Sequence, residues 1–200
     1  SGPSPPQMES ALLECFLSAT RLLPLRLRSS FILIGRAASV FNGFKRYTED
    51  VDVAATSEAI LYFHGAIASG TTQFKCGDPS QTIEFHCSQD FIVHLELLRI
   101  GGGFVDSIAA YEPFRDGFIA SRVGFLALRG VTVADRGEDG DLLDFKFLLR
   151  TTAGRGSILP RLDWRTAEAL KKVAGKLSWV DALVLSGILR EDNFILFESL

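Results

Sequence analysis

Two carboxylates stand two residues apart in the acidic stretch of residues 49–53. If Val51 and Val53 point into a core from a β-strand, Asp50 and Asp52 share the opposite face, because successive side chains of a strand alternate. Two carboxylates on one face repel each other, so ionising both of them costs free energy. A bound divalent cation removes that cost. The spacing predicts a metal site for magnesium or manganese, which take oxygen ligands and substrate phosphates.

A glycine turn precedes this acidic pair. The apolar run of residues 31–34 is typical of a short buried strand, and it stops at Gly35. A short helix is expected over residues 36–41, closed by Asn42-Gly43, whose residues tolerate positive φ. The start of such a helix favours phosphate oxygens, and Gly35 would let a phosphate come close to the backbone.

The remaining elements follow from the period of the apolar residues. Helices are expected at 8–23, at 57–68 with Thr56 or Ser57 as N-cap, and from 139 to about 189 with breaks near 155–157 and Pro160. Strands are expected at 51–54, 82–87, 91–100, 117–120 and 131–133, the second and third forming a hairpin. This order predicts a mixed α/β core with a helical tail.

Composition limits the class of protein. A chain of 200 residues with 47% hydrophobic content is long enough for one core domain plus a small helical appendage. No apolar stretch approaches the roughly 20 residues that span a bilayer, and residues 1–7 read as a flexible lead without a secretory signal.

The chain contains three cysteines, Cys15, Cys76 and Cys87, and this odd number favours reduced thiols and a cytoplasmic location. Together with His86 and His94, these cysteines lack the spacing of a zinc site.

Positive charge is concentrated toward the C-terminus. Residues 145–176 contain eight Lys and Arg against two acidic residues: Lys146, Arg150, Arg155, Arg161, Arg165, Lys171, Lys172 and Lys176 against Asp163 and Glu168. Such a segment is expected either to bind RNA or another phosphorylated partner or to form a solvated basic helix face.

The glycine turn and the acidic pair together resemble the signature of the nucleotidyltransferase superfamily, in particular small bacterial-type members related to abortive-infection toxins. That signature is an apolar strand, Gly-Gly or Gly-Ser, a short helix ending near Asn/His-Gly, and then Arg-x-Thr-x-Asp-apolar-Asp-apolar. The matching residues here are Phe31-Ile-Leu-Ile-Gly35, Asn42-Gly43 and Arg46-Tyr-Thr-Glu-Asp-Val-Asp-Val53. The resemblance implies a mixed β-sheet flanked by helices, with the core at residues 8–135 and a C-terminal helical region at 136–200.

In that family the two aspartates bind metal and a third carboxylate comes from a later strand. Glu96 is the one acid of the 91–98 run, so the resemblance implies Glu96 as the third metal ligand or as the base for the acceptor hydroxyl. Aspartate is usual at that position, and Asp90 and Asp106 are the alternatives. The family also has Gly or Ser where this chain has Arg36.

The resemblance further implies the residues that bind the nucleotide. Around the glycine turn and the acidic pair these are Gly35, Arg36, Ser39, Arg46 and Thr48. The 136–146 segment is similar to the family's Arg/Lys-x-x-Asp-Leu-x-Asp helix, which adds Asp141 and Lys146. For Asp141 and Asp144 the alternative is a stabilising role at a helix N-terminus.

The expected activity is metal-dependent transfer of a nucleoside monophosphate from a nucleoside triphosphate, such as ATP, to an acceptor hydroxyl. The acceptor could be a protein side chain, an RNA 3′ end reached through the basic C-terminal helices, or a small metabolite. The alternative is a module of the same fold that binds a nucleotide or a protein without turnover, because Arg36 and Glu96 depart from the family pattern.

Overall fold

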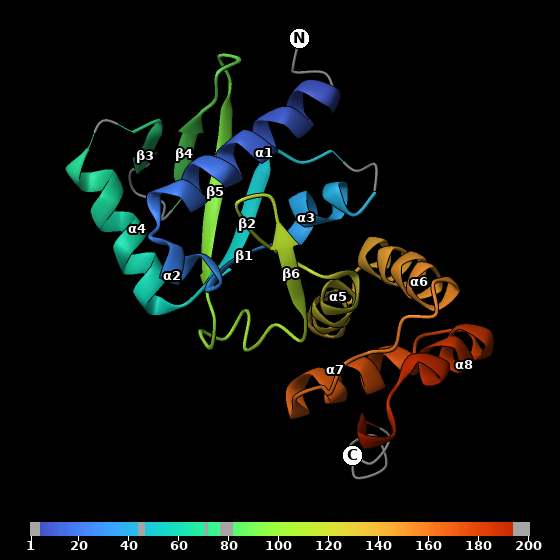
Figure 1. Cartoon of the computed structure of the whole chain (residues 1–200). Helices are drawn as coiled ribbons and strands as arrows, with labels where there is room; N and C mark the ends of the chain where they lie inside the picture. Colours follow the sequence, from blue (N-terminus) through green and yellow to red (C-terminus); the bar gives the residue numbers. More distant parts are fainter. Residues whose placement is uncertain (1–4, 44–46, 71, 77–81, 194–200) are drawn as a thin grey trace. The chain divides into compact units, whose positions relative to one another are not determined.

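A computed structural model of the chain describes residues 5–43, 47–70, 72–76 and 82–193. The chain divides into two compact units (Figure 1). Unit 1 comprises Ser1–Asp106 and Glu112–Ala120, and unit 2 comprises Ser107–Tyr111 and Ser121–Leu200.

Unit 1 is built on a mixed sheet whose strand order, among the described residues, is β3-β4-β5-β2-β1-β7-β6. The strands are β1 (Phe31–Ile34), β2 (Asp50–Ala55), β3 (Phe74–Cys76), β4 (Ile83–His86), β5 (Ile92–Arg99), β6 (Tyr111–Phe114) and β7 (Gly117–Ala120). Strand β2 pairs antiparallel with β1 and parallel with β5, while β7 runs parallel to β1. The expected mixed sheet is confirmed, and β2 lies at its centre.

The helices of unit 1 are α1 (Pro5–Leu22), α2 (Leu25–Arg28), α3 (Gly35–Phe41) and α4 (Ser57–Ser69). Helix α1 begins at Pro5, three residues before the expected start, and buries Cys15 and Phe16 in one cluster with Val51, Val53 and Leu95 of the sheet. Helix α4 is capped by Thr56, whose hydroxyl accepts a hydrogen bond from the Ala59 N–H at 3.4 Å. These helices cover one face of β2 and β5, so the opposite side chains of those strands are left outside this core.

The hairpin expected at residues 82–100 is confirmed as β4 and β5, which pair antiparallel. Its turn contains Asp90 at φ 61°, a left-handed conformation that aspartate tolerates better than most residues. Strands β3 and β6 were not expected. Both are short, and β6 contains a proline, so neither shows the alternating apolar pattern of a longer strand.

Unit 2 contains the helices α5 (Arg122–Arg136), α6 (Asp139–Gly154), α7 (Trp164–Ala174) and α8 (Trp179–Ile188). The strand expected at 131–133 is wrong, because these residues continue α5. The two valines favour a strand locally, but the buried positions of α5 recur with helical spacing, and Gly137 ends the helix in a left-handed conformation at φ 69°. At Gly130 a β-carbon would overlap the Leu170 side chain, so the glycine lets α5 and α7 pack closely.

Within the described ranges, no helix is both long enough and apolar enough to cross a membrane.

Candidate active site

The acidic pair lies on one face of the central strand, as its spacing predicted. Along β2 the exposed Asp50 and the partly buried Asp52 alternate with the fully buried Val51 and Val53. The valines pack into the core under the helices, so both carboxylates project from the other side of the sheet. The shared face expected for Asp50 and Asp52 is therefore present, while metal binding there stays a prediction.

Gly35 lies directly against Asp52. The last residue of β1, Ile34, is in register with Asp52, and the backbone at Gly35 then adopts φ 68°. A β-carbon at Gly35 would overlap the Asp52 carboxylate and come within 2.9 Å of the Asp52 β-carbon. Glycine is therefore required twice, for the left-handed conformation and for the close approach of the acid.

The start of α3 is occupied by Asp52. The backbone N–H of Arg36 donates a hydrogen bond to the Asp52 carboxylate, and the Arg36 guanidinium also favours its charged form. The expected contact between this N–H and a phosphate oxygen stays a prediction, and here the N–H is bonded to the carboxylate instead. At this position the exposed Arg36 side chain is the group that would contact a phosphate.

Glu96 is in register with Asp52 on the neighbouring parallel strand β5. Burial, followed by the charges of Glu96 and then Asp50, raises the pKa of Asp52 from its ordinary value of 3.8 to about 6. The three acids are thus close enough to repel one another, which is the electrostatic problem that a divalent cation removes.

This raised pKa predicts a pH dependence of the metal-free protein. Because Asp52 holds its proton more tightly when folded, its contribution to stability is full below about pH 4 and is lost as the pH rises through about 6. We expect the wild type to lose up to about 3 kcal/mol relative to Asp52→Asn across this window. Urea unfolding of both proteins in EDTA from pH 4 to 8 measures the difference, and parallel curves would contradict it.

The two alternative acids lie elsewhere along β5. Asp90 is in the β4–β5 turn before β5 begins. Asp106 follows the far end of β5, just after the isolated bridge between Ile100 and Val105. Among the three acids that the sequence offered, Glu96 is the one in register with Asp52.

The donor chemistry of the acidic cluster suits magnesium or manganese, since it supplies carboxylate oxygens alone. Within the described residues, however, no three His, Cys, Asp or Glu side chains are grouped as a ready metal cage. Asp50, Asp52 and Glu96 share one face of the sheet, and an ion held there would need waters and substrate phosphates to complete its coordination.

The other expected nucleotide ligands have different surroundings. The Ser39 hydroxyl donates to the Gly35 carbonyl at 3.2 Å within α3. Thr48 is buried, and its hydroxyl accepts from the Asp50 N–H at 3.2 Å, which holds the start of β2. Arg46 lies outside the described residues. Ser39 and Thr48 thus stabilise the backbone around the site.

His94 is a neighbour of the acidic pair that the sequence did not assign to the site. It is in register with Asp50, and its Nδ1 lies 3.6 Å from Asp50 Oδ1. Its position two residues before Glu96 on the same strand face was the available signal, since alternation places both side chains on one side.

Asp141 and Lys146 lie in unit 2, on α6. Asp141 is buried and forms an ion pair of 3.0 Å with Arg129 of α5, which connects the two helices. Lys146 lies near the buried Asp181 of α8, where its charge helps to lower the pKa of that carboxyl below its usual range, after the larger effects of Arg150 and Ser178. Their roles in nucleotide binding stay predictions.

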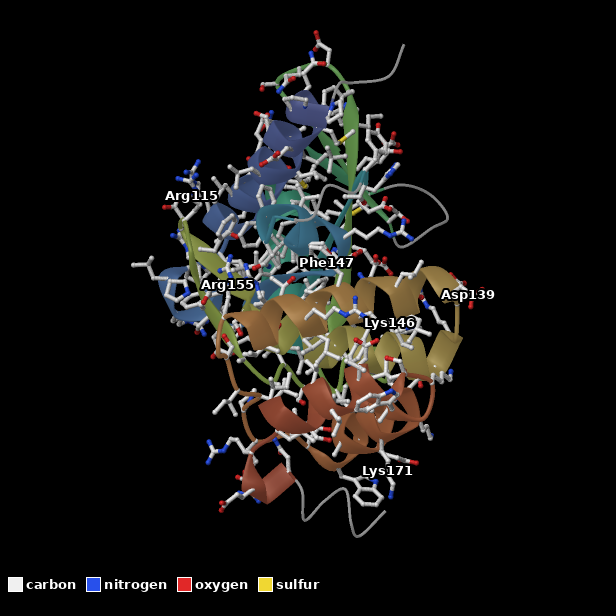
Figure 2. The ribbon with its side chains drawn as sticks, turned by 90° about the vertical axis from the view of Figure 1, so that its right-hand side faces the viewer. Arg115, Asp139, Lys146, Phe147, Arg155 and Lys171 are labelled. Atoms are coloured by element: carbon white, nitrogen blue, oxygen red, sulfur yellow. The ribbon has the colours of Figure 1, made fainter. Side chains whose placement is uncertain are left out.

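The basic segment of residues 145–176 consists of the larger part of α6, a connection and the whole of α7. Figure 2 shows Lys146 and Phe147 on α6 and Lys171 on α7. Some of its charge is already neutralised within unit 2, because Arg150 forms a two-point ion pair with Asp181, at 2.9 and 3.2 Å, and Lys172 lies 3.3 Å from Glu168. This segment is thus less free for phosphate than its sequence suggests.

Comparison with solved structures identifies the fold. An antigenic nucleotidyltransferase-like protein from Paracoccidioides brasiliensis matches with a TM-score of 0.65 at 15% sequence identity, over 90% of this chain and 94% of that chain. Two structures from Helicobacter pylori also match. JHP933 has a TM-score of 0.48 at 12% sequence identity, over 95% of this chain and 93% of that chain. A candidate nucleotidyltransferase has a TM-score of 0.49 at 16% sequence identity, over 96% of this chain and 88% of that chain. No protein-family model and no curated protein matches the sequence.

The chain therefore has a nucleotidyltransferase-like fold, a conclusion that rests on the first of these structures. Fold alone does not establish activity, which has to be argued from the site.

Proposed function

We propose that the chain is a metal-dependent nucleotidyltransferase that moves a nucleoside monophosphate from a nucleoside triphosphate to an acceptor hydroxyl. The observation that carries the proposal is the placement of Asp52, which is aligned with Glu96, shares a strand face with Asp50 and is held against Gly35 by the Arg36 N–H. A structural carboxylate would not normally be fixed beside two other acids, because each like charge disfavours its ionisation.

The charged residues of the site have different roles in the proposed reaction. Asp50 and Asp52, with Glu96, would hold one or two magnesium ions, which when bound neutralise charge on the phosphates of the substrate. Arg36 is exposed beside Asp52 and supplies a planar cation for the triphosphate. Glu96 is the carboxylate placed to accept the proton of the acceptor hydroxyl.

The acceptor oxygen attacks the α-phosphorus, and the bond from that phosphorus to its bridging oxygen breaks. The electron pair leaves with pyrophosphate, and the hydroxyl proton passes to Glu96. Orientation of the triphosphate opposite the acceptor is the main requirement, since correct placement alone removes much of the barrier.

Incubation with each nucleoside triphosphate and magnesium tests the proposal. We expect magnesium-dependent release of pyrophosphate together with a nucleotidylated acceptor detected by mass spectrometry, and neither product in EDTA. Nucleotide binding without pyrophosphate release for any acceptor would instead indicate a binding module of the same fold.

Glu96→Gln tests the role of the base. We expect a fall in the transfer rate of about 10²–10⁴-fold, because a glutamine cannot accept the hydroxyl proton. Glu84→Gln is the matched control: Glu84 lies on the neighbouring strand β4, in register with His94, and its loss should leave the rate within a few-fold. Equal rates for the two variants would remove Glu96 from the reaction.

A further inference from the structure

A cavity of about 530 Å³ lies at the outer edge of β5. Strand β4 begins at Ile83, opposite Leu95, so β5 continues beyond it for the next four residues. The cavity is lined there from both sides of the strand, by Glu96 and Leu98 on one face and Leu97 and Arg99 on the other, and by Ile60, His64, Cys76, Thr82, Ile83, Gly102 and Phe104. All of these residues belong to unit 1.

Glu96 connects this cavity to the acidic pair. In the strand order, β5 stands between β4 and β2, and β1 with Gly35 lies on the far side of β2. The Gly35 turn and the cavity therefore flank Asp52 from opposite directions, with Glu96 between Asp52 and the cavity. An in-line displacement needs the acceptor and the leaving group on opposite sides of the reacting phosphorus.

The lining carries one positive group on mostly apolar walls. Arg99 is exposed, and no described residue forms an ion pair or side-chain hydrogen bond with it. The turn after β5 packs closely on Arg99, because a β-carbon at Gly102 would lie 2.9 Å from the Arg99 carbonyl and 3.2 Å from Nε. Leu97 and Ile60 supply apolar wall, and Phe104, 83% exposed, adds an aromatic ring at the opening.

We infer that this cavity binds the acceptor, and that the acceptor is a small organic anion with an apolar body and a hydroxyl group. The inference rests on the proposed function. The anionic group would pair with Arg99, the body would lie against the apolar wall, and the hydroxyl would reach Glu96, where it attacks the α-phosphorus and gives up its proton as pyrophosphate leaves.

The size and charge of the surroundings favour a small molecule over a nucleic-acid strand. A volume of about 530 Å³ is in the range of small-molecule sites. Unit 1 carries nine Lys and Arg against thirteen Asp and Glu, whereas strand-binding grooves are positively charged along their length.

Cys76 allows a direct test of occupancy. It is an exposed cysteine that lines the cavity, while Cys15 and Cys87 are buried. We would measure its alkylation by N-ethylmaleimide with 4-hydroxyphenylacetate or phenylacetate present, two anions that differ in the hydroxyl alone. Both should slow the reaction at Cys76 several-fold, with mandelamide, an uncharged compound of similar size, as the control that gives no protection.

Variants and turnover complete the test. Arg99→Gln should weaken the binding of both anions about 10–100-fold through loss of a charge-assisted hydrogen bond. Arg26→Gln, which removes a surface arginine paired with Glu58, should leave binding unchanged. With magnesium and a nucleoside triphosphate, 4-hydroxyphenylacetate should increase pyrophosphate release at least tenfold, and its mass should increase by that of one nucleoside monophosphate. Phenylacetate, which lacks the hydroxyl, should inhibit this transfer to 4-hydroxyphenylacetate.

The two hypotheses fail in different ways. Pyrophosphate release with RNA or protein acceptors, with no protection of Cys76 by either anion, would overturn the inference and leave the proposed function standing. Equal affinity in Arg99→Gln and the wild type would also overturn it. Protection of Cys76 without magnesium-dependent pyrophosphate release for any acceptor would reject the proposed function, and the acceptor role of the cavity with it.

Discussion

Replacement of both Asp50 and Asp52 by asparagine is expected to abolish nucleotide transfer while it stabilises the metal-free protein. The amides keep the volume of the acids, and the amide oxygen at position 52 can still accept the Arg36 N–H. They remove the metal ligands, which are worth several kcal/mol of transition-state stabilisation, so the rate should fall at least ~10³-fold. They also remove the buried charge of Asp52, which should add about 1–3 kcal/mol at pH 8 in EDTA.

Thermal and urea unfolding in EDTA and in magnesium measure both effects. Magnesium at ten times its Kd should stabilise the wild type by about 1.4 kcal/mol and should not stabilise the double variant. The single variants separate the contributions, because the stability gain should follow Asp52→Asn, whereas both single variants should lose magnesium stabilisation. A double variant that is less stable in EDTA would identify the pair as structural.

Gly35→Ala is expected to be the most damaging single substitution in the site. The residue would need a left-handed conformation, at a cost of about 1–2 kcal/mol, and its methyl group would overlap Asp52 near its β-carbon, where rotation of the carboxylate gives no relief. We expect a total loss of more than about 3 kcal/mol. Transfer and magnesium stabilisation should be lost as well, because Asp52 must move.

Gly43→Ala provides the control from the other end of α3. Gly43 also has a positive φ, 94°, but among the described residues no heavy atom lies within 4 Å of its added β-carbon. Its cost should be the conformational strain alone, about 1–2 kcal/mol. If urea unfolding gives equal losses for the two variants, the contact between Gly35 and Asp52 contributes nothing to stability.

The local parts of the fold and site could be predicted from the sequence. The run of residues 31–35, the alternation of valine and aspartate along β2, and the alternating hairpin each carry a period of their own. These patterns correctly placed β1, α3, β2 and the β4–β5 pair. The face shared by Asp50 and Asp52 followed from the two-residue period alone.

The parts of the structure that were predicted wrongly, or not predicted, depend on contacts between residues far apart in the sequence. Val131-Thr-Val133 favours a strand in isolation, but packing of α5 against α6 and α7 decides for a helix. The register between Asp52 and Glu96 joins two strands 44 positions apart, which no local pattern fixes. The sequence likewise could not show that the Asp52 carboxylate accepts a hydrogen bond from the Arg36 N–H. Nor could it show that β5 extends beyond the start of β4 and leaves a cavity beside Glu96.

The path of the chain between the two units limits how they can be separated or exchanged. Residues 107–111 belong to unit 2, where the Ser107 hydroxyl bonds the Asp163 carboxylate and the Ala110 carbonyl accepts the Ser121 N–H at 3.1 Å. The chain then returns to unit 1 and supplies β7 beside β1. A gene fragment cut at Asp106 removes β7 from the sheet, and one that begins at Ser121 lacks residues 107–111. A single recombination event therefore either truncates the helical unit or takes β7 away from the sheet, so the two units are expected to be inherited together.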